Sequence, residues 1–207
     1  MTLKLNGSSS GYTAIDAPAT AGSNTLVLPP NNGNANQILK TDGNGNLTWV
    51  DKPSSGITEA DQWQITADFT GGSDPITSGW ARNTQDFQKI GTGLSQSSGV
   101  FSFPSTGKWW IAFQLLSNVS PSDATYHGLY YYVTVNDGTA WTQRGRCYTS
   151  NGSGYGAGFG THLLDVTDKD DVKIRFSVNT SSGSNGTTLG STTAHLTGFT
   201  AIRLGDT

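Results

Sequence analysis

The chain has 207 residues, a formal net charge of −3 and 13% charged residues. A nucleic-acid partner usually needs a clustered basic face, and the 12 lysines and arginines form no cluster along the sequence, so we expect no nucleic acid to bind. No apolar run approaches the length of a membrane span, so we expect no membrane insertion.

Composition favours an all-β fold. The chain holds 27 glycines, and apart from a short turn expected at residues 58–62, no stretch of ten residues carries apolar side chains at helical spacing. The first residues lack the apolar core of a signal peptide, and Cys147 is the only cysteine, so no disulfide forms within the chain. These features predict synthesis in a cytoplasm.

The chain divides near residues 53–56, which predicts two parts, residues 1–56 and residues 57–207. The first part holds short strand-like pieces at residues 2–5, 12–15, 25–28 and 47–50. Pieces this short and this few do not enclose a core alone. We therefore expect the first part to become ordered only when copies from neighbouring chains supply apolar surface.

The first part contains GYTAIDAPATAGSNTLVLP at residues 11–29 and QILKTDGNGNLTWV at residues 37–50. These segments resemble the repeated shaft and collar sequences of tailed-bacteriophage fibres, especially those of phages that infect marine bacteria and cyanobacteria. Residues 17–19 and 21–29 reproduce the repeat, with Val27 at its variable site. The resemblance implies a virion protein of the tail or capsid surface, synthesised in the host cytoplasm, whose first part docks to another virion protein. The docking candidates are Leu3, Leu5, Tyr12 and Ile15.

In the second part, residues 99–113, GVFSFPSTGKWWIAF, predict two strands joined by a turn at residues 104–107. After the turn, apolar side chains alternate with others: Trp109, Ile111, Phe113 and Leu115 on one side, and Lys108, Trp110, Ala112 and Gln114 on the other. This period of two predicts a strand with one fully apolar face that packs in the core.

Within this hairpin, Gly99, Phe101, Pro104 and Gly107 are spaced as in the first signature of the trimeric jelly-roll family, with Trp109 in the aromatic position and Ile111 in place of the second aromatic residue. That family includes the complement globular heads and the tumour necrosis factor superfamily. Residues 164–172 and 196–199 resemble its aspartate-centred turn and its closing strand. The resemblance covers about residues 60–207. It implies a jelly-roll head that forms a homotrimer, preceded here by a short β-rich intertwined stalk.

Two patterns of catalytic type lack their structural context. Residues 7–11, GSSSG, match the Gly-x-Ser-x-Gly pattern of a serine nucleophile, but the strand before it and the helix after it that this nucleophile needs are not predicted. Residues 152–157, GSGYGA, match a relaxed form of the glycine pattern that binds dinucleotides, but no helix is predicted after them. We interpret them as a glycine-rich loop. No acid pair supports a glycosidase. We expect no enzyme activity, no catalytic residue and no cofactor.

Metal ligands are sparse. His127, His162 and His195 lie far apart in the sequence and include no His-x-His pair. Asp168, Asp170 and Asp171 cluster in one short segment, where they either bind calcium or belong to a solvated turn. We predict no metal site and keep the three aspartates as calcium candidates.

Alternation predicts two faces for residues 129–135, LYYYVTV. The core face consists of Leu129, Tyr131, Val133 and Val135. Tyr130 and Tyr132 point the other way, and with Trp110 they are our candidates for the trimer interface. The alternative for the tyrosine pair is a second buried layer of the sandwich.

A second aromatic group lies among turn residues and consists of Tyr126, His127, Trp141, Tyr148, Tyr155 and Phe159. Rings on flexible loops cost ordering entropy unless something binds them, so these are candidates for contact with a host surface glycan or protein. The alternative is that they fold back onto the head or across the trimer seam.

Two functions remain open. The first is a homotrimeric short fibre or fibre tip whose head contacts the host cell surface during adsorption. The second is a capsid or tail decoration protein without a receptor role. Fold does not choose between them.

Overall fold

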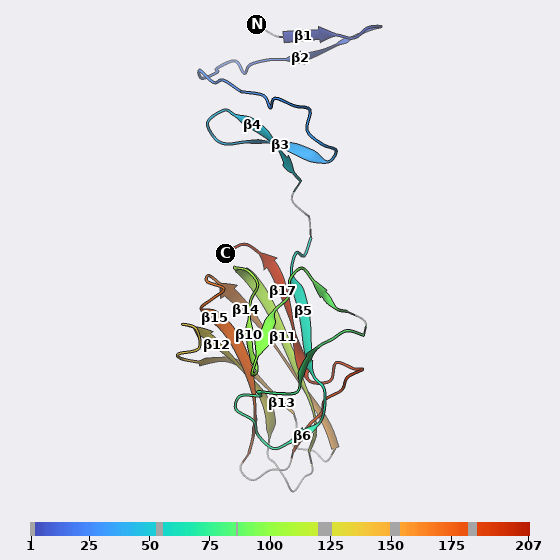
Figure 1. Cartoon of the computed structure of the whole chain (residues 1–207), viewed down its shortest axis with the longest axis vertical. Coiled ribbons are helices and arrows are strands. Elements are labelled where there is room, and N and C mark those ends of the chain that lie inside the picture. The colour runs from blue at the N-terminus through green and yellow to red at the C-terminus, as the bar shows by residue number, and fades with distance from the viewer. Residues whose placement is uncertain (1–2, 53–55, 86, 120–125, 150–153, 182–185) are drawn as a thin grey trace. The chain divides into compact units, whose positions relative to one another are not determined.

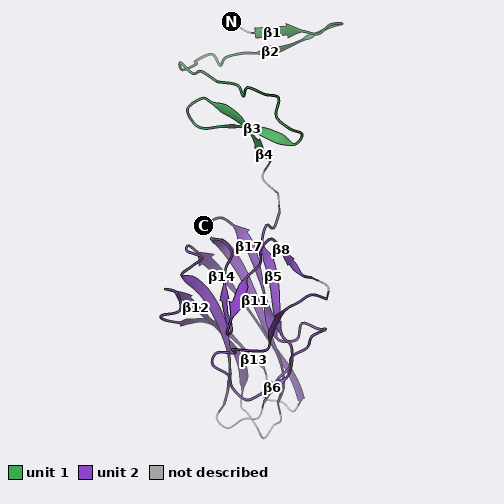
Figure 2. Ribbon diagram, in the orientation of Figure 1, with its two compact units in different colours: residues 1–54 green, residues 55–207 purple. Residues whose placement is uncertain are grey.

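A computed structural model describes residues 3–52, 56–85, 87–119, 126–149, 154–181 and 186–207. The chain forms two compact units, Met1–Ser54 and Ser55–Thr207 (Figure 2). Residues 53–55, around the expected boundary, lie outside the described residues. Within the described ranges every regular element is a β-strand. The same residues therefore include no long apolar helix of the kind that crosses a membrane.

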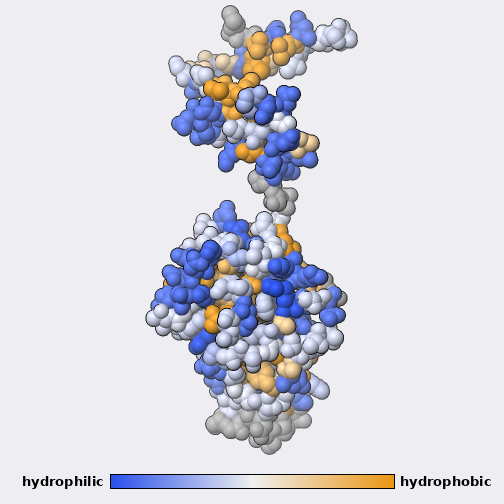
Figure 3. All heavy atoms as spheres, viewed as in Figure 1, coloured by the Kyte–Doolittle hydropathy of each residue, from blue (hydrophilic) through white to orange (hydrophobic). Residues whose placement is uncertain are grey.

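The first unit consists of two hairpins. β1 (Leu3–Asn6) pairs with β2 (Tyr12–Ile15), and β3 (Gln37–Thr41) pairs with β4 (Leu47–Asp51), both antiparallel. β3 is a strand that the sequence analysis missed, and the strand expected at residues 25–28 is only a bridge between Val27 and Asn46. Every residue of β1 and β2 is exposed, and Figure 3 shows apolar side chains at the surface of this unit.

The second unit, which we call the head, contains two antiparallel sheets. The five-stranded sheet has the order β13 (Thr142–Thr149), β12 (His127–Val135), β15 (Val172–Thr180), β10 (Val100–Ser102) and β9 (Ser95–Ser97). The eight-stranded sheet has the order β6 (Phe69–Thr70), β16 (Thr187–Thr188), β11 (Gly107–Val119), β17 (Gly198–Gly205), β5 (Ala60–Ile65) and β7 (Trp80–Arg82). In the same sheet, β14 (Gly154–Val166) pairs with β11, and β8 (Lys89–Ile90) pairs with β5. Figure 1 shows β5, β17 and β11 as neighbours. The turn expected at residues 58–62 is largely replaced by β5.

The core lies between the two sheets and confirms the predicted apolar face of β11. Its Trp109, Ile111, Phe113 and Leu115 are almost completely buried. Three phenylalanine rings from different strands meet there: the centroids of Phe101 and Phe199 are 4.7 Å apart, and those of Phe176 and Phe199 are 4.9 Å apart. Leu129, Tyr131 and Val133 of β12 are buried as predicted, but Val135 is exposed, because it is the last residue of the strand.

The glycine-rich segment at residues 152–157 is not a loop over its described part, because β14 begins at Gly154; residues 152 and 153 lie outside the described residues. The strand needs glycine on its inner side. A Cβ atom at Gly160 would lie 2.4 Å from the Phe113 ring, and one at Gly158 would lie 2.9 Å from the Tyr148 carbonyl oxygen. The missing side chains therefore leave room for the Phe113 ring of the neighbouring strand β11 and for the backbone of β13 in the other sheet.

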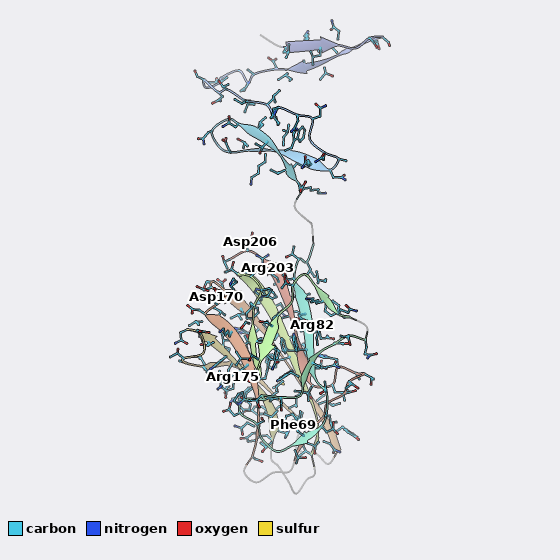
Figure 4. All side chains as sticks on the ribbon, viewed as in Figure 1. Phe69, Arg82, Asp170, Arg175, Arg203 and Asp206 are labelled. Carbon is cyan, nitrogen blue, oxygen red and sulfur yellow. The ribbon has the colours of Figure 1, made fainter. Side chains whose placement is uncertain are left out.

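A buried ion pair fixes one edge of the eight-stranded sheet. Asp61 of β5 is fully buried and accepts hydrogen bonds from Arg82 Nε at 2.8 Å and Arg82 Nη2 at 3.0 Å. The indole Nε1 of Trp63 and the backbone N–H of Leu94 donate to the same carboxylate. The hydrogen bond to Asp61 raises the pKa of Arg82. Figure 4 labels Arg82 beside this sheet.

Candidate functional site

Large apolar side chains gather on the outer surface of the eight-stranded sheet. Directly opposite residues of an antiparallel pair project to the same face, and Trp110 of β11 lies opposite both Leu163 of β14 and Ile202 of β17. Tyr155 and Phe159 share that face with Leu163, since every second side chain of a strand points the same way. Tyr155, Phe159 and Leu163 are 77%, 63% and 69% exposed. We call Trp110, Tyr155, Phe159, Leu163 and Ile202 the apolar face.

The apolar face changes the interpretation of two receptor-contact candidates. Tyr155 and Phe159 do not lie on a flexible loop, as the glycine-rich sequence suggested, but on β14. They extend from the same surface as Trp110, the trimer-interface candidate. The rigid strand removes the entropic argument for a receptor at these two positions, and the extent of the exposed apolar surface favours a protein partner.

A second aromatic group lies on the outer surface of the five-stranded sheet. The ring centroids of Tyr126 and Tyr148 are 5.4 Å apart, and the hydroxyl oxygens of Tyr130 and Tyr148 are 2.8 Å apart in a hydrogen bond. The guanidinium of Arg146 lies 5.3 Å from the Tyr148 ring centroid, in cation–π range. The Tyr148 ring covers Gly128, where a Cβ atom would lie 2.5 Å from the ring. We call Tyr126, Tyr130, Tyr148 and Arg146 the tyrosine cluster.

The tyrosine cluster corrects the assignment of Tyr130 as a trimer-interface residue. Tyr130 is 7% exposed because side chains of its own chain cover it, whereas Tyr148 is 41% exposed. Burial, followed by the hydrogen bond to Tyr148, raises the pKa of Tyr130. Tyr148 therefore presents the accessible surface of the cluster.

Arg175 of β15 links two further candidates. Its guanidinium carbon lies 5.2 Å from the Tyr132 ring centroid and 4.7 Å from that of Trp141, and its Nη2 lies 3.6 Å from a carboxylate oxygen of Asp74. Tyr132 and Trp141 are both half-buried, and burial raises the pKa of Tyr132. Tyr132 lies on the five-stranded sheet and Trp110 on the other, so the interface candidates do not form one surface.

His127 is wrong as a receptor-contact residue because it is fully buried. Its Nε2 lies 2.8 Å from the Thr188 hydroxyl in a hydrogen bond, and its carbonyl oxygen accepts a hydrogen bond from the Thr149 hydroxyl. Burial lowers its pKa. The side chain stabilises the interior at the start of β12.

The three calcium candidates adopt the geometry of a turn. The Asp168 carboxylate accepts a hydrogen bond of 2.8 Å from the backbone N–H of Asp170, and Lys169 forms an ion pair with Asp170 at 2.6 Å. Asp171 is exposed. Among the described residues, no three histidine, cysteine, aspartate or glutamate side chains are grouped as metal ligands.

The docking candidates of the first unit divide between the two faces of the β1–β2 hairpin. Leu3 lies opposite Ile15, and Leu5 is on the same side of β1 as Leu3, so these three side chains share a face on which each is more than half exposed. Tyr12 lies on the other face, with Lys4 Nζ 4.5 Å from its ring centroid. The hairpin thus has one aliphatic face and one mixed face.

No known protein-family model matches the sequence, and no curated protein matches it. Solved structures do match. A crystal structure of murine APRIL at pH 8.5 is 14% identical, with a TM-score of 0.51, and the match covers 70% of this chain and 98% of APRIL. A structure of Eiger TNF from S. frugiperda is 12% identical, with a TM-score of 0.54, and the match covers 73% of this chain and 96% of Eiger. The fold is a TNF-like jelly roll. This confirms the predicted all-β class; identities this low show the fold alone.

The jelly roll unites residues that the sequence analysis did not connect. The cation–π contacts of Arg146 and Arg175 were not predicted. Tyr148 lies only two residues from Arg146 in β13, whereas Tyr132 and Trp141 are far from Arg175 in the sequence. One local signal was present: Gly128 lies two residues before Tyr130 in a strand, and a strand glycine often marks a site where another group approaches closely. Here that group is the Tyr148 ring.

Proposed function

We propose that this chain is a structural virion protein of a tailed phage, a homotrimeric short fibre or fibre tip whose head contacts the host cell surface. The resemblance of residues 11–29 and 37–50 to phage fibre repeats supports the virion setting. The TNF-like fold of the head is compatible with a trimer. The protein acts by binding, without catalysis or a cofactor.

The apolar face is the observation that carries the proposal of self-association. Soluble monomers seldom expose contiguous surfaces with several large apolar side chains. Trp110 and Leu163 lie opposite each other in the sheet, and Phe159 is exposed four residues away on the same side of β14. Packing three heads through this face covers it and places Tyr155 and Phe159 in the subunit interface rather than in the receptor contact.

The first unit gives a second reason for intertwined copies. Ile38 and Leu39 are adjacent in β3, so they point to opposite faces, and both are more than 40% exposed. Leu26 and Leu28 are exposed as well. A hairpin with apolar side chains on both faces needs cover on both sides, which neighbouring copies supply, and the aliphatic face of β1–β2 is left to dock on another virion protein.

The tyrosine cluster is our candidate for contact with a host surface glycan or protein. It lies on the five-stranded sheet, whereas the apolar face lies on the other sheet, so a trimer formed through the apolar face leaves the cluster accessible. Tyr148 is held between Tyr126 and Tyr130 before any partner arrives. Aromatic anchors that are ordered in advance lose little entropy on binding.

The test combines location with competition. A labelled antibody against the protein locates it on intact virions, and the purified chain is then added to host cells before phage. We expect labelling at the tail and reduced adsorption, with a weaker effect for the Tyr148→Ala variant than for a Tyr155→Ala trimer. Capsid labelling without competition would reject the receptor role and select the decoration function.

A further inference from the structure

A pocket of about 350 Å³ opens in the head where residues 71–79 connect β6 to β7. Ile65 and Ile76 line it from the core and are 1% and 3% exposed. Phe69, labelled in Figure 4, lines it as well, half-buried and packed against the same core. The pocket therefore has apolar walls that include one aromatic ring, and it shares no lining residue with the apolar face or the tyrosine cluster.

Polar groups accompany these apolar walls. Asp68 Oδ1 accepts a hydrogen bond of 2.9 Å from the Gly190 N–H, whereas no described residue donates to Asp68 Oδ2. Three hydroxyl-bearing residues, Ser73, Thr77 and Ser78, also line the pocket. The Ser73 hydroxyl donates its proton to the Pro75 carbonyl oxygen at 3.0 Å, so it is left as an acceptor. The lining thus offers one carboxylate oxygen as a strong acceptor, the Ser73 oxygen as a weaker one, and the hydroxyls of Thr77 and Ser78, which both donate and accept.

Backbone and side-chain hydrogen bonds hold the wall of residues 71–79 in place. Ser73 and Val178 exchange two backbone hydrogen bonds of 2.9 and 2.8 Å. The Ile76 N–H donates to the Phe176 carbonyl oxygen at 2.9 Å, and the Ile76 carbonyl oxygen accepts from Trp80 Nε1 at 3.0 Å. A wall fixed in this way loses little conformational entropy when a ligand binds.

We propose that this pocket binds one neutral sugar ring. A pyranose presents an apolar C–H face and a rim of hydroxyl groups, which match the Phe69 ring and the polar lining around Asp68. The negative charge of Asp68 disfavours phosphate and carboxylate groups. The volume is at the small end of the range for ligand pockets, roughly 300 to 1,000 Å³, which suits a single ring. The proposal rests on the proposed function only in taking a host surface glycan as the source of the sugar.

Saturation-transfer NMR on the full chain tests the site, with the methyl glycosides of glucose, galactose, mannose and N-acetylglucosamine as separate probes. We expect saturation of the ring C–H protons of at least one glycoside. Phe69→Ala should weaken its binding about tenfold, and Ser78→Trp, which fills the pocket mouth from an exposed position, should abolish it. Asp68→Asn keeps an oxygen that accepts from the Gly190 N–H but removes the negative charge. Because a hydrogen bond to a neutral oxygen is weaker than one to a carboxylate, this variant should weaken glycoside binding about fivefold.

Leu204→Ala removes an exposed apolar side chain elsewhere on the head, outside the apolar face and the tyrosine cluster, and is the matched control, which should bind as the unmodified chain does. The proposal is overturned if no glycoside receives saturation, if Ser78→Trp binds normally, or if choline binds in preference to every glycoside, because that would identify a cation site. Adsorption competition is a separate measurement. If the chain binds a glycoside but does not reduce phage adsorption, the pocket is supported as a sugar site and the proposed adsorption role is rejected.

Discussion

Trp110 of β11 lies directly opposite Leu163 of β14, and both project from the outer surface of the eight-stranded sheet. Leu163 is 69% exposed in the single chain. If this surface joins three heads, a charge placed at its centre is buried without a partner and costs several kcal/mol. We expect the unmodified chain to have a mass of about 65 kDa by light scattering, three times its 21.8 kDa, and Leu163→Glu to be a monomer.

The control for this prediction is Tyr148→Glu, which places the same charge on the five-stranded sheet. It should keep the trimeric mass. A monomeric mass for the unmodified chain would reject the trimer, and a trimeric Leu163→Glu would move the interface away from the apolar face.

Gly160 of β14 faces the Phe113 ring so closely that a Cβ atom would lie 2.4 Å from it. Gly160→Ala should therefore displace a core ring and lower the free energy of unfolding by about 1 to 3 kcal/mol. Gly205→Ala is the matched control, because no atom lies within 4 Å of its Cβ position. Urea unfolding of both variants gives the comparison, and equal midpoints would show that β14 does not pack as described.

Asp61 is fully buried between Arg82, Trp63 and the Leu94 N–H. Asp61→Ala leaves these donors without their shared acceptor, and removing one partner of a buried ion pair costs about 3 kcal/mol. Asp165→Ala breaks the exposed pair with Lys108 and should cost less than about 1 kcal/mol. Thermal unfolding measures both, and a similar loss for the two variants would contradict the role of burial.

The predictable parts of the fold are those whose signal is local. Alternation along β11 identifies its core face, because one side of a strand packs inward regardless of its neighbours. The start of β14 was predicted as a loop, because glycine is also a turn signal. The glycine at position 160 fits the strand because it makes room for Phe113, about fifty residues away in the sequence. The tyrosine cluster could not be assembled, because the position of Tyr148 over Gly128 depends on the register between β12 and β13. Local polarity misassigned His127, whose partner Thr188 lies on the other sheet.

The burial of His127 predicts how stability depends on pH. Burial lowers its pKa in the folded chain, whereas an unfolded histidine has a pKa of about 6.5. Between these values the unfolded chain binds more protons, so the free energy of unfolding falls as the pH falls below about 6.5. His127→Gln keeps a polar group for Thr188 but does not titrate, and it should lose less stability than the unmodified chain between pH 7 and pH 5. Burial lowers the pKa of His162 and His195 as well, so part of the dependence remains. Urea midpoints at the two pH values measure the difference, and an unchanged pH dependence in His127→Gln would show that this histidine is not buried in its neutral form.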